Sequence, residues 1–142
     1  MKSLIFAITP LSSFYMCGVI WVIQLIQYPS FLVVSQDHFV SFHARHSAVM
    51  GLLVGPVMIL ELVSALSLVW LQPHLVSIIN LAMVVGLWLL TFFVSVPLHN
   101  QLSLGFSTET INRLIETNWP RTFLWTSKAI LVLWWFEIKK LP

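Results

Sequence analysis

Four long apolar runs leave this chain few ways to fold outside a membrane. They are residues 4–26, 50–71, 76–98 and 123–138. A helix needs about 20 apolar residues to cross a bilayer core, and the last run reaches that length if residues 119–122 continue it. Charged residues make up only 8% of the 142 residues, against roughly 25% in soluble domains. The sequence therefore predicts an all-α integral membrane protein.

The lengths of the runs and their connections predict one domain over residues 1–142, a bundle of four transmembrane helices. The second and third runs are separated only by Gln72, Pro73 and His74, which predicts a tight turn. We expect spans at about 4–30, 48–71, 75–99 and 119–139. A net charge of +2 is too small to indicate a nucleic-acid partner.

The two longer connections each predict a short amphipathic helix on the membrane surface, over about 36–46 and 108–118. Each begins with a Ser or Thr and an acid, which favour a helix start. Apolar residues then recur at helical spacing, such as Phe39 with Phe42 and Ile111 with Leu114. Both surface helices would lie at one membrane face.

The order of elements predicts a two-hairpin pseudo-repeat, because a span, a surface helix and a span occur twice. Pro29 and Pro97 follow the first and third spans at matching positions. Lys and Arg are equally numerous at the two ends, so the positive-inside rule leaves the orientation open, with a slight preference for cytoplasmic termini.

Three histidines are candidates for a site at the face that carries the surface helices. His43 and His46 share one side of a helix, and His99 ends the third span. Three converging imidazoles could bind a transition metal, one could ligate a haem, or they could act as general bases. The alternative is that these rings meet only water and lipid headgroups at the interface.

Glu61 lies well inside the second span, where an ionised acid costs at least about 2.5–3.5 kcal/mol. Lys128 lies at a comparable depth in the last span, so an ion pair is the first interpretation. A catalytic, proton-relay or ligating carboxylate is the alternative. Other polar or aromatic residues near the same face are candidates for substrate binding: Gln24, Tyr28, Asn100, Asn118, Trp119 and Arg121.

The order of several motifs resembles that of the anthrone oxygenase-like family of small four-span bacterial membrane proteins. The motifs are W-x-x-Q-x-x-x-Y-P-x-F from Trp21, F-H-A-R-H from Phe42, P-x-M-x-x-E from Pro56, V-P-L-H-N-Q-L from Val96 and N-W-x-R-T-x-x-W-T from Asn118. The resemblance implies a bacterial inner-membrane protein of the oxidoreductase type. The activity named for the family is oxygenation of a polycyclic anthrone to an anthraquinone.

Two functions remain open from the sequence. The first is a membrane oxidoreductase that oxidises or oxygenates a lipid-soluble aromatic or quinone-like molecule. His43, His46, His99 and Glu61 would be its catalytic residues, and the three histidines its metal ligands if a metal is bound. The second is a non-enzymatic accessory subunit or lipid-binding component, with partner membrane proteins or further copies of the chain.

Overall fold

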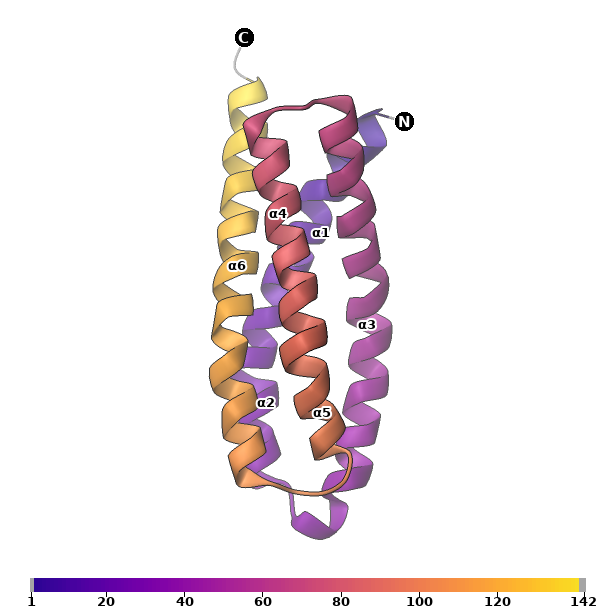
Figure 1. The fold of residues 1–142 in the computed structure, drawn as a ribbon, viewed down its shortest axis with the longest axis vertical. Coiled ribbons are helices and arrows are strands. Elements are labelled where there is room, and N and C mark those ends of the chain that lie inside the picture. Colours follow the sequence, from indigo (N-terminus) through magenta and orange to yellow (C-terminus); the bar gives the residue numbers. More distant parts are fainter. Residues whose placement is uncertain (1, 141–142) are drawn as a thin grey trace.

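The computed structural model describes residues 2–140, and the side chains of residues 4–136. This part of the chain forms four long helices that lie side by side (Figure 1). The first comprises α1 (Lys2–Val22), η1 (Ile23–Gln27), α2 (Tyr28–Ser30) and η2 (Phe31–Val33), and the second is α3 (Gln36–Leu71). The third comprises α4 (Leu75–Leu90), η3 (Thr91–Ser95) and α5 (Val96–Leu102), and the fourth is α6 (Thr108–Lys140).

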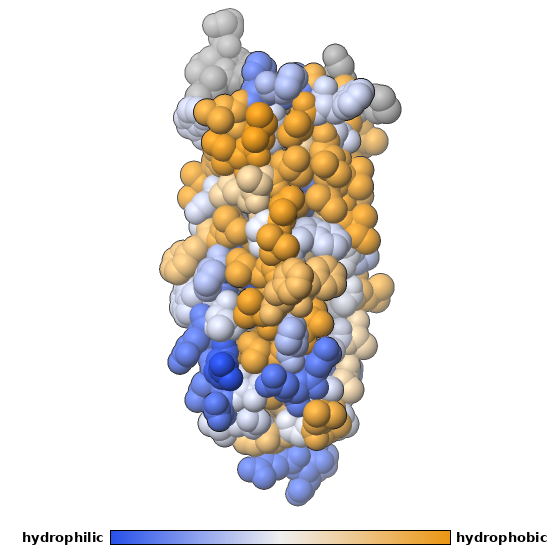
Figure 2. Space-filling view, viewed as in Figure 1, coloured by the Kyte–Doolittle hydropathy of each residue, from blue (hydrophilic) through white to orange (hydrophobic). Residues whose placement is uncertain are grey.

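Three helices in the described part of the chain are long and apolar enough to cross a membrane: Leu4–Val33, Gln36–Leu71 and Leu75–Leu102. α6 has a comparable length, but it carries Arg121 and Lys128 among its apolar residues and is not one of the three. Figure 2 shows apolar side chains over most of one face and hydrophilic ones gathered at the end where α3 and α6 begin. The expectation of an all-helical chain is confirmed for the described residues, and three of its helices are suited to crossing a membrane.

The two predicted surface helices are not separate elements. Residues 36–46 are the first turns of α3, and residues 108–118 are the first turns of α6. Much of their apolar face packs into the bundle rather than onto a membrane surface: Phe39, Ile111 and Leu114 are fully buried in one core cluster, whereas Phe42 is 37% exposed. The prediction was wrong because an apolar face satisfied by neighbouring helices has the same spacing as one that lies on lipid.

The predicted turn between the second and third spans is confirmed at Gln72–His74, where the helix is interrupted. Ser77 closes this turn: its hydroxyl accepts the His74 backbone N–H at 3.0 Å and donates to backbone carbonyls. The turn and the outer ends of α1 and α6 lie at one end of the bundle (Figure 1). The connections at residues 34–35 and 103–107 lie at the other, which we call the polar end.

Two π-helical turns interrupt the first and third helices at matching positions. η1 ends two residues before Pro29, and η3 ends two residues before Pro97. Proline lacks the N–H that would close a regular turn, and a wider turn accommodates this change. π-turns are frequent at functional sites, and both of these border the cavity described below.

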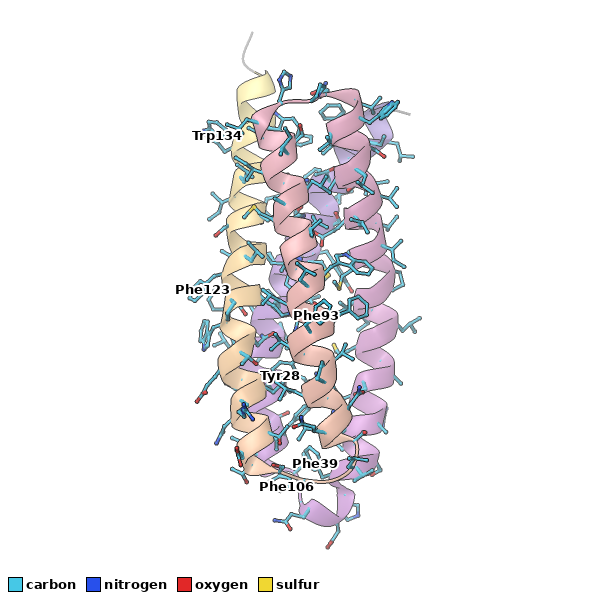
Figure 3. The ribbon with its side chains drawn as sticks, in the orientation of Figure 1. Tyr28, Phe39, Phe93, Phe106, Phe123 and Trp134 are labelled. Carbon is cyan, nitrogen blue, oxygen red and sulfur yellow. The ribbon has the colours of Figure 1, made fainter. Side chains whose placement is uncertain are left out.

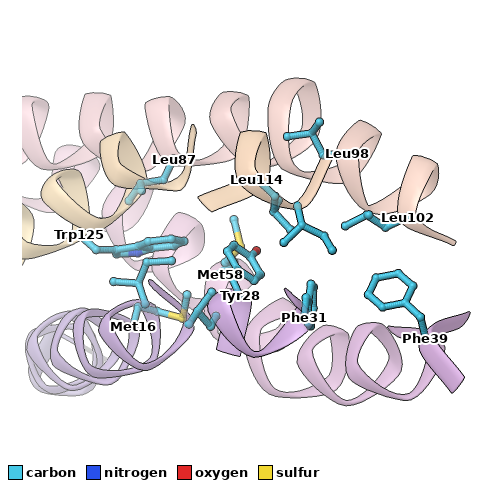
Figure 4. Packing of buried hydrophobic residues seen from close by; sticks show 13 residues of the cluster. Met16, Tyr28, Phe31, Phe39, Met58, Leu87, Leu98, Leu102, Leu114 and Trp125 are labelled. Atoms are coloured by element: carbon cyan, nitrogen blue, oxygen red, sulfur yellow. The ribbon is translucent and has the colours of Figure 1, made fainter. Parts of the chain in front are cut away.

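Buried apolar side chains fill the axis of the bundle from its middle to the polar end. Figure 4 shows Trp125 with Met16 in the middle and Phe31 and Phe39 towards the polar end. Figure 3 places Tyr28 between the helices, whereas Phe93, Phe123 and Trp134 project outwards. The outward residues are at least half exposed, as expected of side chains that face lipid.

Candidate functional site

Three histidines from two helices meet inside the bundle near its polar end. His43 and His46 lie one turn apart on α3, and His99 lies on α5. The centroid of the His99 ring is 5.2 Å from that of His43 and 5.7 Å from that of His46, with planes within 25° and 18°. His43 and His46 are only 2% and 8% exposed. The rings therefore face inwards, not towards headgroups.

A hydrogen-bonded chain joins two of these rings to Tyr28. The Tyr28 hydroxyl lies 3.1 Å from Nε2 of His99, and Nδ1 of His99 lies 2.9 Å from Nε2 of His43. In one arrangement the Tyr28 hydroxyl donates to Nε2 of His99, and Nδ1 of His99 donates to Nε2 of His43. In the other, Nε2 of His43 donates to Nδ1 of His99, and Nε2 of His99 donates to the tyrosine oxygen. Moving each proton across its hydrogen bond, while the tyrosine oxygen takes up one proton and Nδ1 of His43 releases one, converts the first arrangement into the second. The Tyr28–His99–His43 chain can thus carry a proton between its ends.

Aromatic side chains hold the imidazoles in place. Phe31 is fully buried and meets His43 and His46 edge to face, with ring centroids 5.7 Å and 4.9 Å away. Phe39 stacks on His43 at 5.8 Å, with planes 18° apart. Such contacts fix ring orientation, so the nitrogens keep the directions that the hydrogen bonds need.

The described residues do not fit the predicted three-histidine metal centre as they are arranged. Among them, no group of three or more His, Cys, Asp or Glu side chains is placed to hold a metal ion. Nε2 of His43 and Nδ1 of His99 are directed at each other as hydrogen-bond partners, whereas metal ligands direct their lone pairs at a common centre. This geometry favours the alternative in which the imidazoles act as bases.

A cavity of about 560 Å³ lies beside the histidines, within the usual range for small-molecule sites. Its walls are mostly apolar and come from all four helices. The predicted site residues that line it are Tyr28, His43, His46, Asn100, His99 and Arg121. The cavity thus joins an apolar space to a small set of convergent polar groups.

Arg121 enters the cavity wall from α6 and is only 5% exposed. Its Nη1 donates to the hydroxyl of Ser95 at 2.8 Å and to Oδ1 of Asn118 at 3.0 Å. Asn118 in turn donates to Oε1 of Gln24 at 2.8 Å. Gln24 and Asn118 do not line the cavity, so the structure makes them supports of the guanidinium rather than substrate contacts.

Trp119 was also predicted to bind substrate, and the structure places it outside the cavity lining. Its ring contacts Trp21 edge to face at 5.9 Å and stacks on Phe123 at 5.3 Å. Since Phe123 is 58% exposed, this aromatic group belongs to the outer surface of the bundle. Its position suits an interfacial anchor.

Glu61 does not join the histidines. Its Oε1 accepts a hydrogen bond from Nζ of Lys128 at 2.6 Å, and its Oε2 accepts one from the indole N–H of Trp125 at 3.1 Å. Lys128 also donates to the hydroxyl of Ser13 at 2.6 Å. Neither charged side chain is more than 2% exposed. The ion-pair interpretation is confirmed, and the proposed catalytic role of Glu61 has no support in this geometry.

Sequence reasoning missed several residues of the site, including Phe31, Thr91 and Ser95. Phe31 encloses the imidazoles, and Thr91 and Ser95 line the cavity. The signal for the last two was present, because they lie eight and four residues before His99 and so share its side of a helix. Phe31 ends the W-x-x-Q-x-x-x-Y-P-x-F motif, but its spacing gave no such signal, since its apolar side chain could equally have faced lipid.

Comparisons of the chain with family models, with curated proteins and with solved structures gave no match. The resemblance to the anthrone oxygenase-like family therefore stays a prediction.

Proposed function

We propose that this chain is a membrane-embedded oxidoreductase that oxygenates a flat, lipid-soluble aromatic molecule of the anthrone or quinol type. The observation that carries the proposal is the Tyr28–His99–His43 chain in the wall of an apolar cavity. Hydrogen-bonded side chains that only stabilise the fold do not require a cavity beside them, and a cavity that only holds an apolar molecule does not require imidazoles in its wall. Together they suit a lipophilic substrate that must lose a proton.

An anthrone shows how the reaction balances without a cofactor. The hydrogen-bonded residues Tyr28, His99 and His43 remove one proton from the CH₂ group. The resulting electron-rich anion reduces dioxygen as a C–O bond forms. The hydroperoxide then loses its second C–H proton and breaks its O–O bond, which yields the new carbonyl and one water. One dioxygen is consumed per product, and the proton taken by the imidazoles returns to the departing oxygen.

The same proposal makes α6 the fourth span of a multi-pass protein of the bacterial inner membrane. Lys128 would bar a lone helix from the bilayer core, but inside the bundle it is paired with Glu61. The matching positions of η1 and η3 before Pro29 and Pro97 support the two-hairpin repeat. Surrounding lipids are the expected partners of the exposed apolar side chains.

The test is turnover by purified protein in lipid nanodiscs, with an anthrone as substrate and protein-free nanodiscs as the blank. We expect His99→Phe to lower turnover at least about 100-fold, because acid–base groups contribute 10²–10⁴-fold and phenylalanine keeps the ring but removes both hydrogen bonds. His38→Phe is the matched control, since His38 is exposed at the same end. Equal turnover by His99→Phe and wild type would contradict the proposal.

The alternative, a non-enzymatic accessory or lipid-binding component, is favoured by the apolar character of the cavity walls. A lipid tail would fit such walls without any chemistry. Under this alternative, wild-type protein gives no turnover above the blank. The amount of lipid that co-purifies with the protein is then the same for wild type and His99→Phe. Product formation that depends on His99 with one dioxygen consumed per product would exclude it.

A further inference from the structure

The two long walls of the cavity differ in a regular way. On α3, the lining residues Ser47, Gly51 and Gly55 recur every four positions. A Cβ atom added at either glycine would meet no atom within 4 Å. The facing wall carries Trp88 and Phe92 together with Val96, again four positions apart. The α3 wall thus offers backbone at two glycines between larger side chains such as Met50 and Val54, whereas the facing wall carries the aromatic rings of Trp88 and Phe92.

The edges of both walls reach the outer surface of the bundle. Gly51 is exposed on α3, and Phe92 and Val96 are 53% and 37% exposed on the facing helix. Gly51 lies fifteen residues after the start of α3, or about 22 Å along the helix. This part of α3 lies within a candidate membrane span, so the proposed membrane embedding would place the open edge of the cavity against hydrocarbon.

We infer that a lipophilic ligand enters and leaves this cavity sideways from the bilayer, through the seam between Gly51 and Gly55 on one side and Phe92 and Val96 on the other. The inference rests on the proposed function for the identity of the ligand. Glycine lets a flat ring lie directly against the helix backbone, while the facing aromatic side chains offer a surface for stacking. The seam is thus shaped for a flat molecule.

Unpaired donors identify the chemistry of the ligand more closely. Besides Nδ1 of His43, the cavity lining has two buried N–H groups without a partner: Nε1 of Trp88 and Nε of Arg121. Arg121 is bonded to Ser95, which lies seven residues from Trp88, or about 10 Å along the helix. Small rotations of these side chains would let one ligand oxygen accept a hydrogen bond from Trp88 and another accept one from Arg121. The ligand class is therefore a flat polycycle with carbonyl or phenolic oxygens near both ends.

A saturated lipid tail fits this arrangement less well, because it would leave both donors unpaired. Buried polar groups in proteins are nearly always hydrogen-bonded. An oxygenated aromatic would satisfy the donors and stack between the walls at the same time. The cavity therefore discriminates between two molecules that are both soluble in the bilayer.

Binding kinetics test the seam without relying on turnover. The probe is a hydroxyanthraquinone dosed into vesicles that contain the protein, with quenching of tryptophan fluorescence as the readout. We expect Gly51→Leu to slow association and dissociation by a similar factor of ten or more, because the substitution narrows an entrance at the rim. Gly18→Leu is the matched control, since Gly18 is an exposed helical glycine with open space at its Cβ and lies outside the cavity lining.

Unchanged association and dissociation rates in both Gly51→Leu and Gly55→Leu would overturn lateral entry. Lateral entry would also be overturned if a water-soluble, polymer-linked probe bound faster than a probe tethered to a phospholipid. Trp88→Phe tests the ligand chemistry: we expect it to weaken binding of the hydroxyanthraquinone about fivefold and leave binding of unsubstituted anthracene unchanged. Equal effects on the two probes would overturn the oxygen-recognition part. Failure of the proposed function appears separately, as wild-type protein that binds the probe through the seam but turns over no anthrone.

Discussion

Two groups of buried polar residues lie on the axis of this bundle, and they differ in how completely their hydrogen bonds are satisfied. In the first group, Glu61 and Lys128 bond to each other, to Trp125 and to Ser13. In the second, at the cavity, Nδ1 of His43 is buried without a partner. The first group is closed on itself, whereas the second retains hydrogen-bonding capacity.

This difference separates a structural role from a functional one. A buried charge is tolerated only where a partner compensates it, and the Glu61–Lys128 pair meets that condition entirely within the protein. The histidine group lies instead beside a space that a ligand can occupy. Its unpaired nitrogen is a cost that a stabilising role would not explain. The comparison therefore supports a stabilising role for the Glu61–Lys128 pair, and the unpaired nitrogen at the cavity is consistent with the chemistry proposed for the polar end.

Breaking the Glu61–Lys128 ion pair should produce the largest change in stability. Glu61→Ala leaves Lys128 buried without its counter-charge, and we expect a loss of about 3–5 kcal/mol in the free energy of unfolding. The double variant Glu61→Met with Lys128→Met should recover most of this loss. Circular dichroism during titration of detergent-solubilised protein with SDS measures both. Single variants that are no less stable than the double variant would contradict a compensated pair.

Tyr28→Phe tests the far end of the proton-transfer chain. The ring and its packing remain, but the hydrogen bond to His99 is lost. We expect turnover to fall by no more than about 10²-fold, less than in His99→Phe, and stability to change by only about 0.5–1.5 kcal/mol. Tyr15→Phe is the control, because Tyr15 is exposed and its hydroxyl donates only to the Leu53 carbonyl at 3.4 Å. Equal turnover in the two variants would remove Tyr28 from the chain.

His46→Phe should have the smallest effect and defines the limit of the chain. His46 stacks on His99 but lies outside the Tyr28–His99–His43 hydrogen bonds. A phenylalanine preserves the stack, so we expect a change of at most about 1 kcal/mol in the free energy of unfolding and turnover within a few-fold of wild type. A loss of turnover as large as that of His99→Phe would place His46 among the reacting groups.

Several features could be predicted because they follow from local sequence. Apolar run lengths predicted the helices, and Gln72–His74 predicted the turn between the second and third. The comparable depths of Glu61 and Lys128 in their spans predicted their ion pair. The amphipathic segments around Phe39 and Ile111 gave the wrong result, because helical spacing shows that an apolar face exists but not what covers it.

Only part of the candidate site could likewise be predicted from the sequence. The spacing of His43 and His46, with His99 at the end of another span, predicted three imidazoles at one level. Nothing in the spacing indicated that Gln24 and Asn118 would support Arg121 from behind, or that Trp119 would face outwards. Those outcomes depend on how far each helix is rotated about its own axis, and packing between helices sets that rotation.

The sequence by itself determined that this chain is helical, suited to a membrane, and rich in histidine at one end of the bundle. It did so because apolar length and helical spacing are properties of single segments. Only the tertiary structure decided that His43 and His99 are joined by a hydrogen bond rather than arranged around a metal. It alone also brought Gly51, Gly55, Trp88 and Phe92 into the lining of one cavity. Both results depend on distances between side chains that are remote in the chain, and those distances exist only once the helices have packed.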